Sequence, residues 1–220
     1  NWKAGNSQGS SNTDGSVNTT YTSVNTTAGF SISSFTTPSS GTFTVGHGLG
    51  VAPKWIIYRP VTSSGWQIGH DSIGWTKAVF FDTQSQQTST AFGNTDPTNT
   101  VWTGNSANVG GNASCIAYCF AEKTGYSKFG SYTGNGNADG TFVYTGFKPA
   151  FVMVKRTDNT SDWQMQDNKR IGYNINNYRL SANLSAAETT SGVMDLISNG
   201  FKFRGTPMNT NGGTFIYMAF

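Results

Sequence analysis

The sequence is poor in charge and has no long apolar run. Only 11% of its 220 residues are charged, and the 14 basic and 11 acidic side chains are scattered along the chain. No basic cluster could neutralise several adjacent phosphates, so we expect no nucleic acid among its ligands. No apolar stretch approaches the roughly 18 residues of a membrane-spanning helix, so we expect no membrane insertion. No secretory signal peptide is visible at the N-terminus.

Histidine is also scarce, which limits the options for acid–base catalysis. His47 and His70 are the only two. His47 lies in the glycine-rich stretch 46–50, which precedes an expected strand instead of opening a helix, so a turn is predicted and not a phosphate-binding loop. The acidic residues mostly lie in turn contexts, such as Asp139 before Gly140. We predict no catalytic residues and keep a carboxylate pair that hydrolyses a polysaccharide as an alternative.

Cysteine is limited to Cys115 and Cys119. In an extended strand the two side chains point to one face but lie roughly 13 Å apart, at about 3.3 Å per residue, which is too far for a disulfide. Neither has the neighbouring histidine or cysteine that a zinc site needs. The spacing predicts two buried free thiols. We expect no metal and no other cofactor, and the sequence leaves calcium at a loop cluster of Asp and Asn residues open.

Glycine, small polar residues and aromatics are abundant. The chain has 27 glycines, and aromatic residues make up 14% of it. Aromatic and β-branched residues favour strands, and good helix formers are few. The aromatic content also argues against disorder, because disordered chains lack apolar surface to bury. The composition therefore predicts a rigid β protein with uncharged polar loops.

The sequence repeats itself in order, at offsets of 96 to 101 residues. The matched positions share residue type and neighbours: Ser34 with Ser131, Pro53 with Pro149, Trp55 with Phe151, Arg59 with Lys155, Trp66 with Trp163, Trp75 with Tyr173, Ile116 with Ile216, and Phe120 with Phe220. So many ordered matches indicate two copies of one module of about 97 residues.

Within each copy, short alternating segments between turns predict an all-β fold. We expect two tandem β-sandwich repeat domains of jelly-roll type, residues 29–122 and 123–220, behind an extended polar leader over residues 1–28. An all-β barrel is the alternative. Residues 185–191 and 193–197 alone show a faint helical pattern. Residues 1–4 resemble the end of a module at 119–122, which predicts that the chain is cut from a longer array.

The aromatic residues offer the best candidate binding sites. Trp66 and Trp163 occupy matching strand positions and are predicted to lie in the cores. The loops 70–77 and 167–179 are equivalent and differ in length, which is typical of surface loops. Aromatic faces beside cationic and amide donors suit a sugar ring. The candidate ligand-binding residues are Trp75, Lys77, His70, Arg170, Tyr173, Tyr178 and Arg179. As an alternative, Trp75 and Tyr173 anchor their loops on the sandwich, and His70 is weakened as an acid or base because the second copy has Asp167 there.

Three motifs carry a resemblance to a known group of proteins. The stretches 46–54, 117–122 and 136–149, together with the leader over residues 2–30, resemble tandem modules of long virion proteins from tailed bacteriophages, many of them marine. The resemblance covers the whole chain and is specific to these modules. It supplies no catalytic residues to carry over.

The resemblance implies a location in the virion, in a tail fibre or another exterior appendage, that is extracellular when mature. The favoured function is non-enzymatic adhesion to host cell-surface glycan through loops. The expected partners are other virion chains and further copies of this chain, with a homo-trimer as the expected form. A purely structural or capsid-decorating module is the alternative, and a polysaccharide depolymerase is the third.

Overall fold

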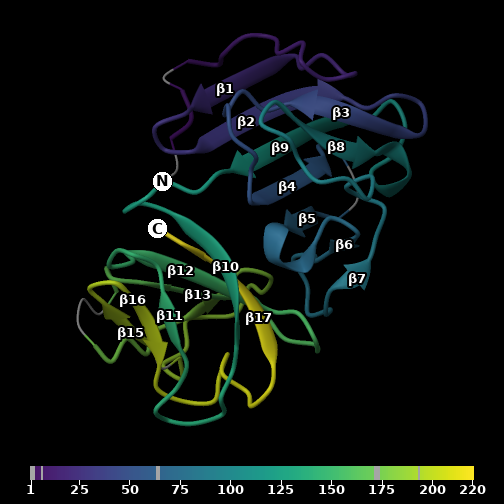
Figure 1. Ribbon diagram of the computed structural model, residues 1–220. Helices are drawn as coiled ribbons and strands as arrows, with labels where there is room; N and C mark the ends of the chain where they lie inside the picture. The colour runs from purple at the N-terminus through teal and green to yellow at the C-terminus, as the bar shows by residue number, and fades with distance from the viewer. Residues whose placement is uncertain (1–2, 6, 63–64, 171–173, 193) are drawn as a thin grey trace. The chain divides into compact units, whose positions relative to one another are not determined.

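The computed structural model describes residues 3–5, 7–62, 65–170, 174–192 and 194–220 (Figure 1). Over these residues the fold is all-β, with 41% strand, 3% helix, several antiparallel sheets and no barrel. The all-β expectation is confirmed, and the barrel alternative is wrong. In the described residues no helix is long and apolar enough to span a membrane. Contacts divide the chain into unit 1, residues 1–80 and 87–123, and unit 2, residues 81–86 and 124–220.

Unit 1 is built on a five-stranded antiparallel sheet with the order β1-β2-β9-β4-β5. Its strands are β1 (Tyr21–Asn25), β2 (Phe30–Thr36), β9 (Ser114–Phe120), β4 (Trp55–Pro60) and β5 (Gln67–His70). The remaining elements are two short pairs and two 3-10 turns: β3 (Thr42–Gly46) with β8 (Val101–Asn105), β6 (Lys77–Ala78) with β7 (Gln87–Thr88), η1 (Asp71–Ile73) and η2 (Ser106–Asn108).

Unit 2 repeats this strand order. Its larger sheet runs β10-β17-β12-β13-β14, so β10, β17, β12 and β13 take the places of β2, β9, β4 and β5. The smaller sheet runs β11-β16-β15, with β11 and β16 in the places of β3 and β8. The bounds are β10 (Lys128–Thr133), β11 (Phe142–Tyr144), β12 (Phe151–Arg156), β13 (Gln164–Asp167), β14 (Leu180–Ser181), β15 (Met194–Ile197), β16 (Gly200–Phe203) and β17 (Thr214–Ala219).

The strand β15 corrects one expectation. Residues 193–197 were expected to be faintly helical, but Met194–Ile197 form a strand paired with β16. Met194 and Leu196 point into the core while Asp195 points the other way, which is the period of a strand. Pairing with β16 therefore decides the conformation of a segment whose local preference is weak.

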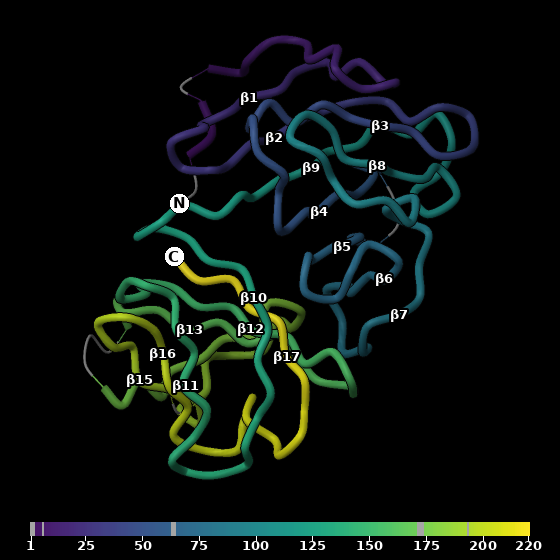
Figure 2. The backbone as a smooth tube through the Cα atoms, viewed as in Figure 1, coloured from purple at the N-terminus to yellow at the C-terminus, as the bar shows by residue number. Residues whose placement is uncertain are grey.

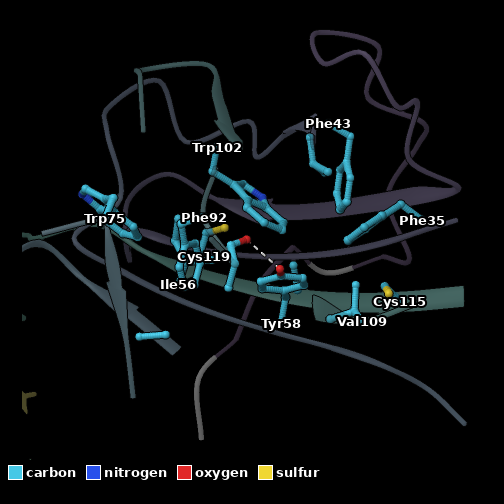
Figure 3. Packing of buried hydrophobic residues seen from close by; sticks show 14 of the residues in the cluster. Phe35, Phe43, Ile56, Tyr58, Trp75, Phe92, Trp102, Val109, Cys115 and Cys119 are labelled. Carbon is cyan, nitrogen blue, oxygen red and sulfur yellow. Dashed lines mark hydrogen bonds between the residues drawn. The ribbon is translucent and has the colours of Figure 1, made fainter. Parts of the chain in front are cut away.

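The core of unit 1 lies between its five-stranded sheet and the β3–β8 pair (Figure 3). Trp102 is fully buried at its centre, with Phe35 at 5.9 Å and Tyr58 at 4.9 Å between ring centroids. The Tyr58 hydroxyl donates to the Ala91 carbonyl at 2.7 Å, so the buried phenol has its partner. Each such side chain contributes about 2–3 kcal/mol from apolar burial.

Cys115 and Cys119 line the same core face as free, buried thiols, which confirms the prediction (Figure 3). Burial raises the pKa of Cys115 to about 11 and raises that of Cys119 further. Both thiols therefore stay protonated and unreactive near neutral pH.

Unit 2 has its own core between its two sheets. Phe201 is fully buried opposite Val143, and it contacts the Tyr217 ring edge-to-face at 5.3 Å. Tyr132 stacks on Phe215 at 4.9 Å and donates its hydroxyl proton to the Met208 carbonyl at 2.7 Å. Alternating apolar positions on β12, β16 and β17 supply most of the remaining core.

The leader is bound to unit 1 along two strand edges (Figure 2). The Ser10 carbonyl accepts from Thr22 N on β1 at 2.8 Å. Farther along, Val17 N donates to the Thr44 carbonyl on β3 at 3.0 Å, and Ser16 and Thr44 exchange two backbone-to-hydroxyl hydrogen bonds. The leader therefore covers the outer edge of β3.

Residues 81–86 belong to unit 2 by their contacts, although the rest of that unit begins only at residue 124. The Phe81 ring lies 5.2 Å from Trp163. The Lys155 ammonium donates to the Asp82 carbonyl at 3.0 Å, and Ser161 N donates to the Thr83 carbonyl at 2.8 Å. These contacts bury Lys155 and Trp163 completely.

Candidate functional site

Trp75, the first sequence-based candidate, lies in the core of unit 1 and not on a loop surface. Only 3% of its surface is exposed, and its ring packs edge-to-face on Phe92 at 5.3 Å (Figure 3). Gly69 leaves the room for this packing, because a Cβ there would lie 2.8 Å from Phe92. A buried ring cannot stack on a sugar, so we assign Trp75 to the core. This placement fits the loop-anchor alternative.

His70 is also buried, at the end of β5. Its Nδ1 accepts from Ser72 N at 3.0 Å, and its ring meets Trp55 edge-to-face at 4.9 Å. It acts as the cap of η1. Lys77 lies on β6 and is half-buried. His47 is likewise a turn residue, because its Nδ1 accepts from Leu49 N at 3.1 Å.

Arg170, Tyr178 and Arg179, candidates of the second copy, lie on loops of unit 2, and the two arginines are tied to neighbouring side chains. Arg170 bridges Asp167 at 3.0 Å and Glu188 at 2.9 Å. Arg179 Nε donates to the hydroxyl of Thr189 at 3.0 Å. Tyr178 is half-buried. Tyr173 lies outside the described residues.

The matched tryptophans differ in burial, which corrects the expectation that both lie in cores. Trp163 is fully buried, whereas Trp66 is partly exposed. Each has the matching cation over its ring, Arg59 at 4.9 Å from Trp66 and Lys155 at 5.9 Å from Trp163. The segment 81–86 covers the pair in unit 2.

Two exposed aromatic side chains of unit 2 lie together on β11. Tyr144 is 62% exposed and Phe142 is 43% exposed, on the face of the β11-β16-β15 sheet opposite the core residue Val143. Opposite Tyr144 in β16 is Gly200. A Cβ at Gly200 would lie 2.8 Å from Phe142 Cε2, so the missing side chain lets the Phe142 ring lie across the strand. We call Phe142, Tyr144 and Gly200 the aromatic platform.

The platform lies at an open strand edge. Phe203 N donates to the Thr141 carbonyl and Thr145 N to the Asn199 carbonyl, so the alternate residues Phe142 and Tyr144 direct their backbone groups away from β16. Within the described part of the chain these groups have no hydrogen-bond partner. Main-chain donors and acceptors are therefore available beside the two rings.

A cluster of four charged side chains borders the platform. Lys202 lies directly opposite Phe142 and bridges Asp139 at 2.5 Å. Arg204 Nε donates to Asp195 at 2.5 Å, and Arg204 Nη1 is 3.7 Å from Asp139. The hydrogen bond and charge of Lys202 hold the pKa of Asp139 below its usual range. We call Asp139, Asp195, Lys202 and Arg204 the ion cluster.

The loop that carries Asp139 is held by Asn209, which is fully buried. Asn209 Oδ1 accepts from Asn135 N at 3.1 Å and Thr141 N at 3.3 Å. Its Nδ2 donates to Asn135 Oδ1 at 2.9 Å and to the Asn137 carbonyl at 3.0 Å. One side chain therefore sets the course of the loop into β11.

The equivalent edge of unit 1 is closed. Val45 and Trp102 form a core pair of β3 and β8, so Thr44 and Gly46 lie on the other face of β3, as Phe142 and Tyr144 lie on the other face of β11 from Val143. Thr44 binds the leader, and a Cβ at Gly46 would overlap the Asn12 side chain. On β11 the outward positions instead carry the exposed rings of Phe142 and Tyr144.

Sequence reasoning missed this site. The alternation Phe142-Val143-Tyr144 identifies a strand but not which face is exposed, and Asp139 was interpreted as a turn residue. A usable signal lay in Phe201-Lys202-Phe203-Arg204, where two cations alternate with two core aromatics. Among the described residues, no group of three His, Cys, Asp or Glu side chains is placed to hold a metal ion.

Comparison with known proteins identifies a family without assigning a role. The sequence matches a family described as a domain of unknown function, DUF7483, over residues 1–220. No curated protein and no solved structure matches it significantly. Because the family match spans the whole sequence given, the chain belongs to the DUF7483 family.

Proposed function

We propose that the chain is a non-enzymatic module of a bacteriophage virion that binds host-surface glycan through the aromatic platform. The virion setting, a tail fibre or another exterior appendage, rests on the resemblance of the stretches 46–54 and 136–149 to phage virion modules. In this proposal the chain forms two tandem jelly-roll-like β-sandwich repeats, residues 29–122 and 123–220, behind the leader.

The observation that carries glycan binding is the exposure of two aromatic rings beside charged groups. Phe142 and Tyr144 remain exposed although each has an apolar face, and the ion cluster lies next to them. A sugar ring has apolar C–H faces and polar hydroxyl edges, so it matches rings that are flanked by hydrogen-bonding groups. The open backbone groups of β11 add donors and acceptors at the same place.

The chemistry of Asp139 and of the two histidines supports binding rather than hydrolysis. A glycosidase needs one carboxyl group that stays protonated to act as an acid. Asp139 is held as an anion by Lys202, since its pKa is below the usual range. His47 and His70 are buried and their Nδ1 atoms accept backbone hydrogen bonds.

A shallow platform on a sheet face binds a sugar weakly, so adhesion in this proposal depends on copy number. Linked sites raise the overall affinity by effective concentration without new contacts. Further virion chains and a homo-oligomer of this chain, with a trimer as the expected form, would supply those copies.

The test is a glycan array with the whole chain and two matched variants. Tyr144→Ala removes an exposed ring from the platform, and Tyr21→Ala removes a 40% exposed ring from β1 of unit 1. We expect Tyr144→Ala to weaken glycan binding at least tenfold, which is about 1.4 kcal/mol, and Tyr21→Ala to leave binding unchanged. Unfolding curves of both variants should match the wild type.

Two results would replace the proposal. Silence across bacterial surface polysaccharides, in an assembled form of the protein, would favour a purely structural or capsid-decorating module. Shortening of a polysaccharide during incubation would favour a depolymerase. Equal losses in Tyr144→Ala and Tyr21→Ala would move the site away from the platform.

A further inference from the structure

We propose that the aromatic platform takes an acidic sugar, whose carboxylate replaces Asp139 on Lys202 and Arg204. This inference rests on the proposed glycan binding and names the chemical class of the glycan. The ring of the sugar lies on Phe142 and Tyr144, and its carboxylate occupies the place that an internal carboxylate holds in the free protein.

The first support is that the two cations already bind a carboxylate that is easily displaced. The side chain of Asp139 is 82% exposed, yet both Lys202 and Arg204 approach its Oδ1. An exposed ion pair contributes little net stability, because water solvates the separated charges well. A ligand carboxylate can therefore exchange with Asp139 at small cost.

The second support is the state of Arg204. Its Nε donates to Asp195, which is 94% buried and so fixes the guanidinium in place. The Nη1 of Arg204 lies 3.7 Å from Asp139, beyond hydrogen-bond distance. Within the described residues neither Nη atom of Arg204 has a hydrogen-bond acceptor. A guanidinium with unused donors suits a planar carboxylate.

The third support is the register of the sheet, which places charge beside the ring. Lys202 and Phe142 are direct partners at a non-hydrogen-bonded position of the antiparallel pair, where side chains lie closest. A sugar that stacks on Phe142 therefore brings a ring substituent next to the Lys202 ammonium. A carboxylate at that position makes the contact that Asp139 makes in the free protein.

Charge balance favours an acid over a neutral sugar. The ion cluster contains two cations and two anions, and its net charge is zero. Exchange of Asp139 for a ligand carboxylate keeps both cations paired, whereas a neutral sugar could not take the place of Asp139. The platform should therefore distinguish sugars by charge.

The experiment compares one ligand in two charge states. The probes are an oligosaccharide of hexuronic acid and its carboxyl-reduced neutral counterpart, titrated against the whole chain and Asp139→Asn. This variant keeps the size of the side chain and removes the competing charge. We expect Asp139→Asn to bind the acidic probe up to about fivefold more tightly than the wild type does, because the probe no longer has to break the exposed Asp139–Lys202 ion pair. Binding of the neutral probe should not change.

Two further variants separate the inference from general charge effects. Asp71→Asn removes another exposed carboxylate, which bridges Lys54 at 2.9 Å in unit 1, and should leave both affinities unchanged. Lys202→Gln should abolish the preference for the acidic probe. If the acidic probe binds Asp139→Asn no more tightly than wild type, the inference is overturned while glycan binding stands. If neither probe nor any array glycan binds, both proposals fail.

Discussion

The two units of this chain share one strand order, but different parts of each are covered. In each unit the cover is a segment that lies far along the chain from the strands it contacts. In unit 1 the leader covers the edge of β3, and the Arg59–Trp66 pair remains partly exposed. In unit 2 the edge of β11 is open, and segment 81–86 buries the Lys155–Trp163 pair. Both covering segments come from elsewhere in the sequence.

This contrast shows that two units of the same strand order can each keep a core while the outward residues of the corresponding edge strands, β3 and β11, differ. Val45–Trp102 and Val143–Phe201 are antiparallel pairs of core residues in their own units. The outward neighbours differ, because Thr44 and Gly46 accommodate a chain segment whereas Phe142 and Tyr144 present rings. The proposed binding site therefore exists in one copy.

The largest loss of stability is expected at Asn209, which holds the loop that leads into the open edge strand β11. Asn209→Ala removes a side chain that makes four hydrogen bonds to loop residues 135, 137 and 141. Because buried groups lose their partners, we expect the free energy of unfolding to fall by about 3 kcal/mol. Denaturant unfolding measures the loss.

The control for this prediction is Asn211→Ala, which changes an exposed asparagine nearby and should cost under about 0.5 kcal/mol. Asn209→Asp keeps the acceptor oxygen, so its loss of unfolding free energy should lie between those of Asn209→Ala and Asn211→Ala. Equal stability of Asn209→Ala and Asn211→Ala would show that the loop does not depend on Asn209.

A smaller effect is expected at the leader edge of unit 1. Gly46→Ala introduces a Cβ where Asn12 lies, and Asn12 Oδ1 accepts from Asp14 N at 2.9 Å. Displacement of this side chain should cost about 1–2 kcal/mol and loosen the leader. Hydrogen exchange should then show faster exchange at Val17 N, which donates to Thr44.

Gly65→Ala is the matched control, because a Cβ at Gly65 meets open space at an ordinary φ. It should leave the exchange of Val17 N unchanged. Undiminished protection of Val17 in Gly46→Ala would mean that close approach at Gly46 does not hold the leader.

The smallest effect concerns the covered cation of unit 2. Burial lowers the pKa of Lys155 to about 8, against the opposing charges of Asp82 and Asp162. The unfolded chain keeps this proton up to about pH 10.5, so it binds more protons than the folded chain between pH 8 and 10.5, and stability rises with pH in that window. Between pH 7 and pH 9 the free energy of unfolding of the wild type should therefore rise by about 1 kcal/mol relative to that of Lys155→Met.

Arg59→Met is the counterpart in unit 1 and should show no such pH dependence, because arginine does not titrate in this range. Unfolding curves at several pH values measure both differences. A pH-independent difference between wild type and Lys155→Met would contradict the burial of this amine by segment 81–86.

Part of the fold follows from local sequence pattern. The ordered matches, such as Trp55 with Phe151, indicated two copies of one module, and the same strand order recurs in both units. Alternation and turn residues predicted the strands, because a strand with one buried face must alternate. The spacing of Cys115 and Cys119 predicted two free thiols on one face, as found.

The candidate site could not be predicted, because exposure depends on what packs over a residue. Trp75 was placed on a surface loop but lies against Phe92 in the core. Trp66 was placed in the core but is partly exposed, since no local pattern tells it from Trp163. Phe142 and Tyr144 were interpreted only as strand residues.

The sequence by itself therefore determined the period and the strand character of each unit, since these depend on neighbours in the chain. Tertiary structure alone decided which edge is closed and which cation–tryptophan pair is buried. The reason is physical: both segments contact strands that lie far from them in the sequence, the leader through backbone hydrogen bonds and segment 81–86 also through the Phe81 ring and the Lys155 side chain. No pattern of neighbouring residues marks such contacts.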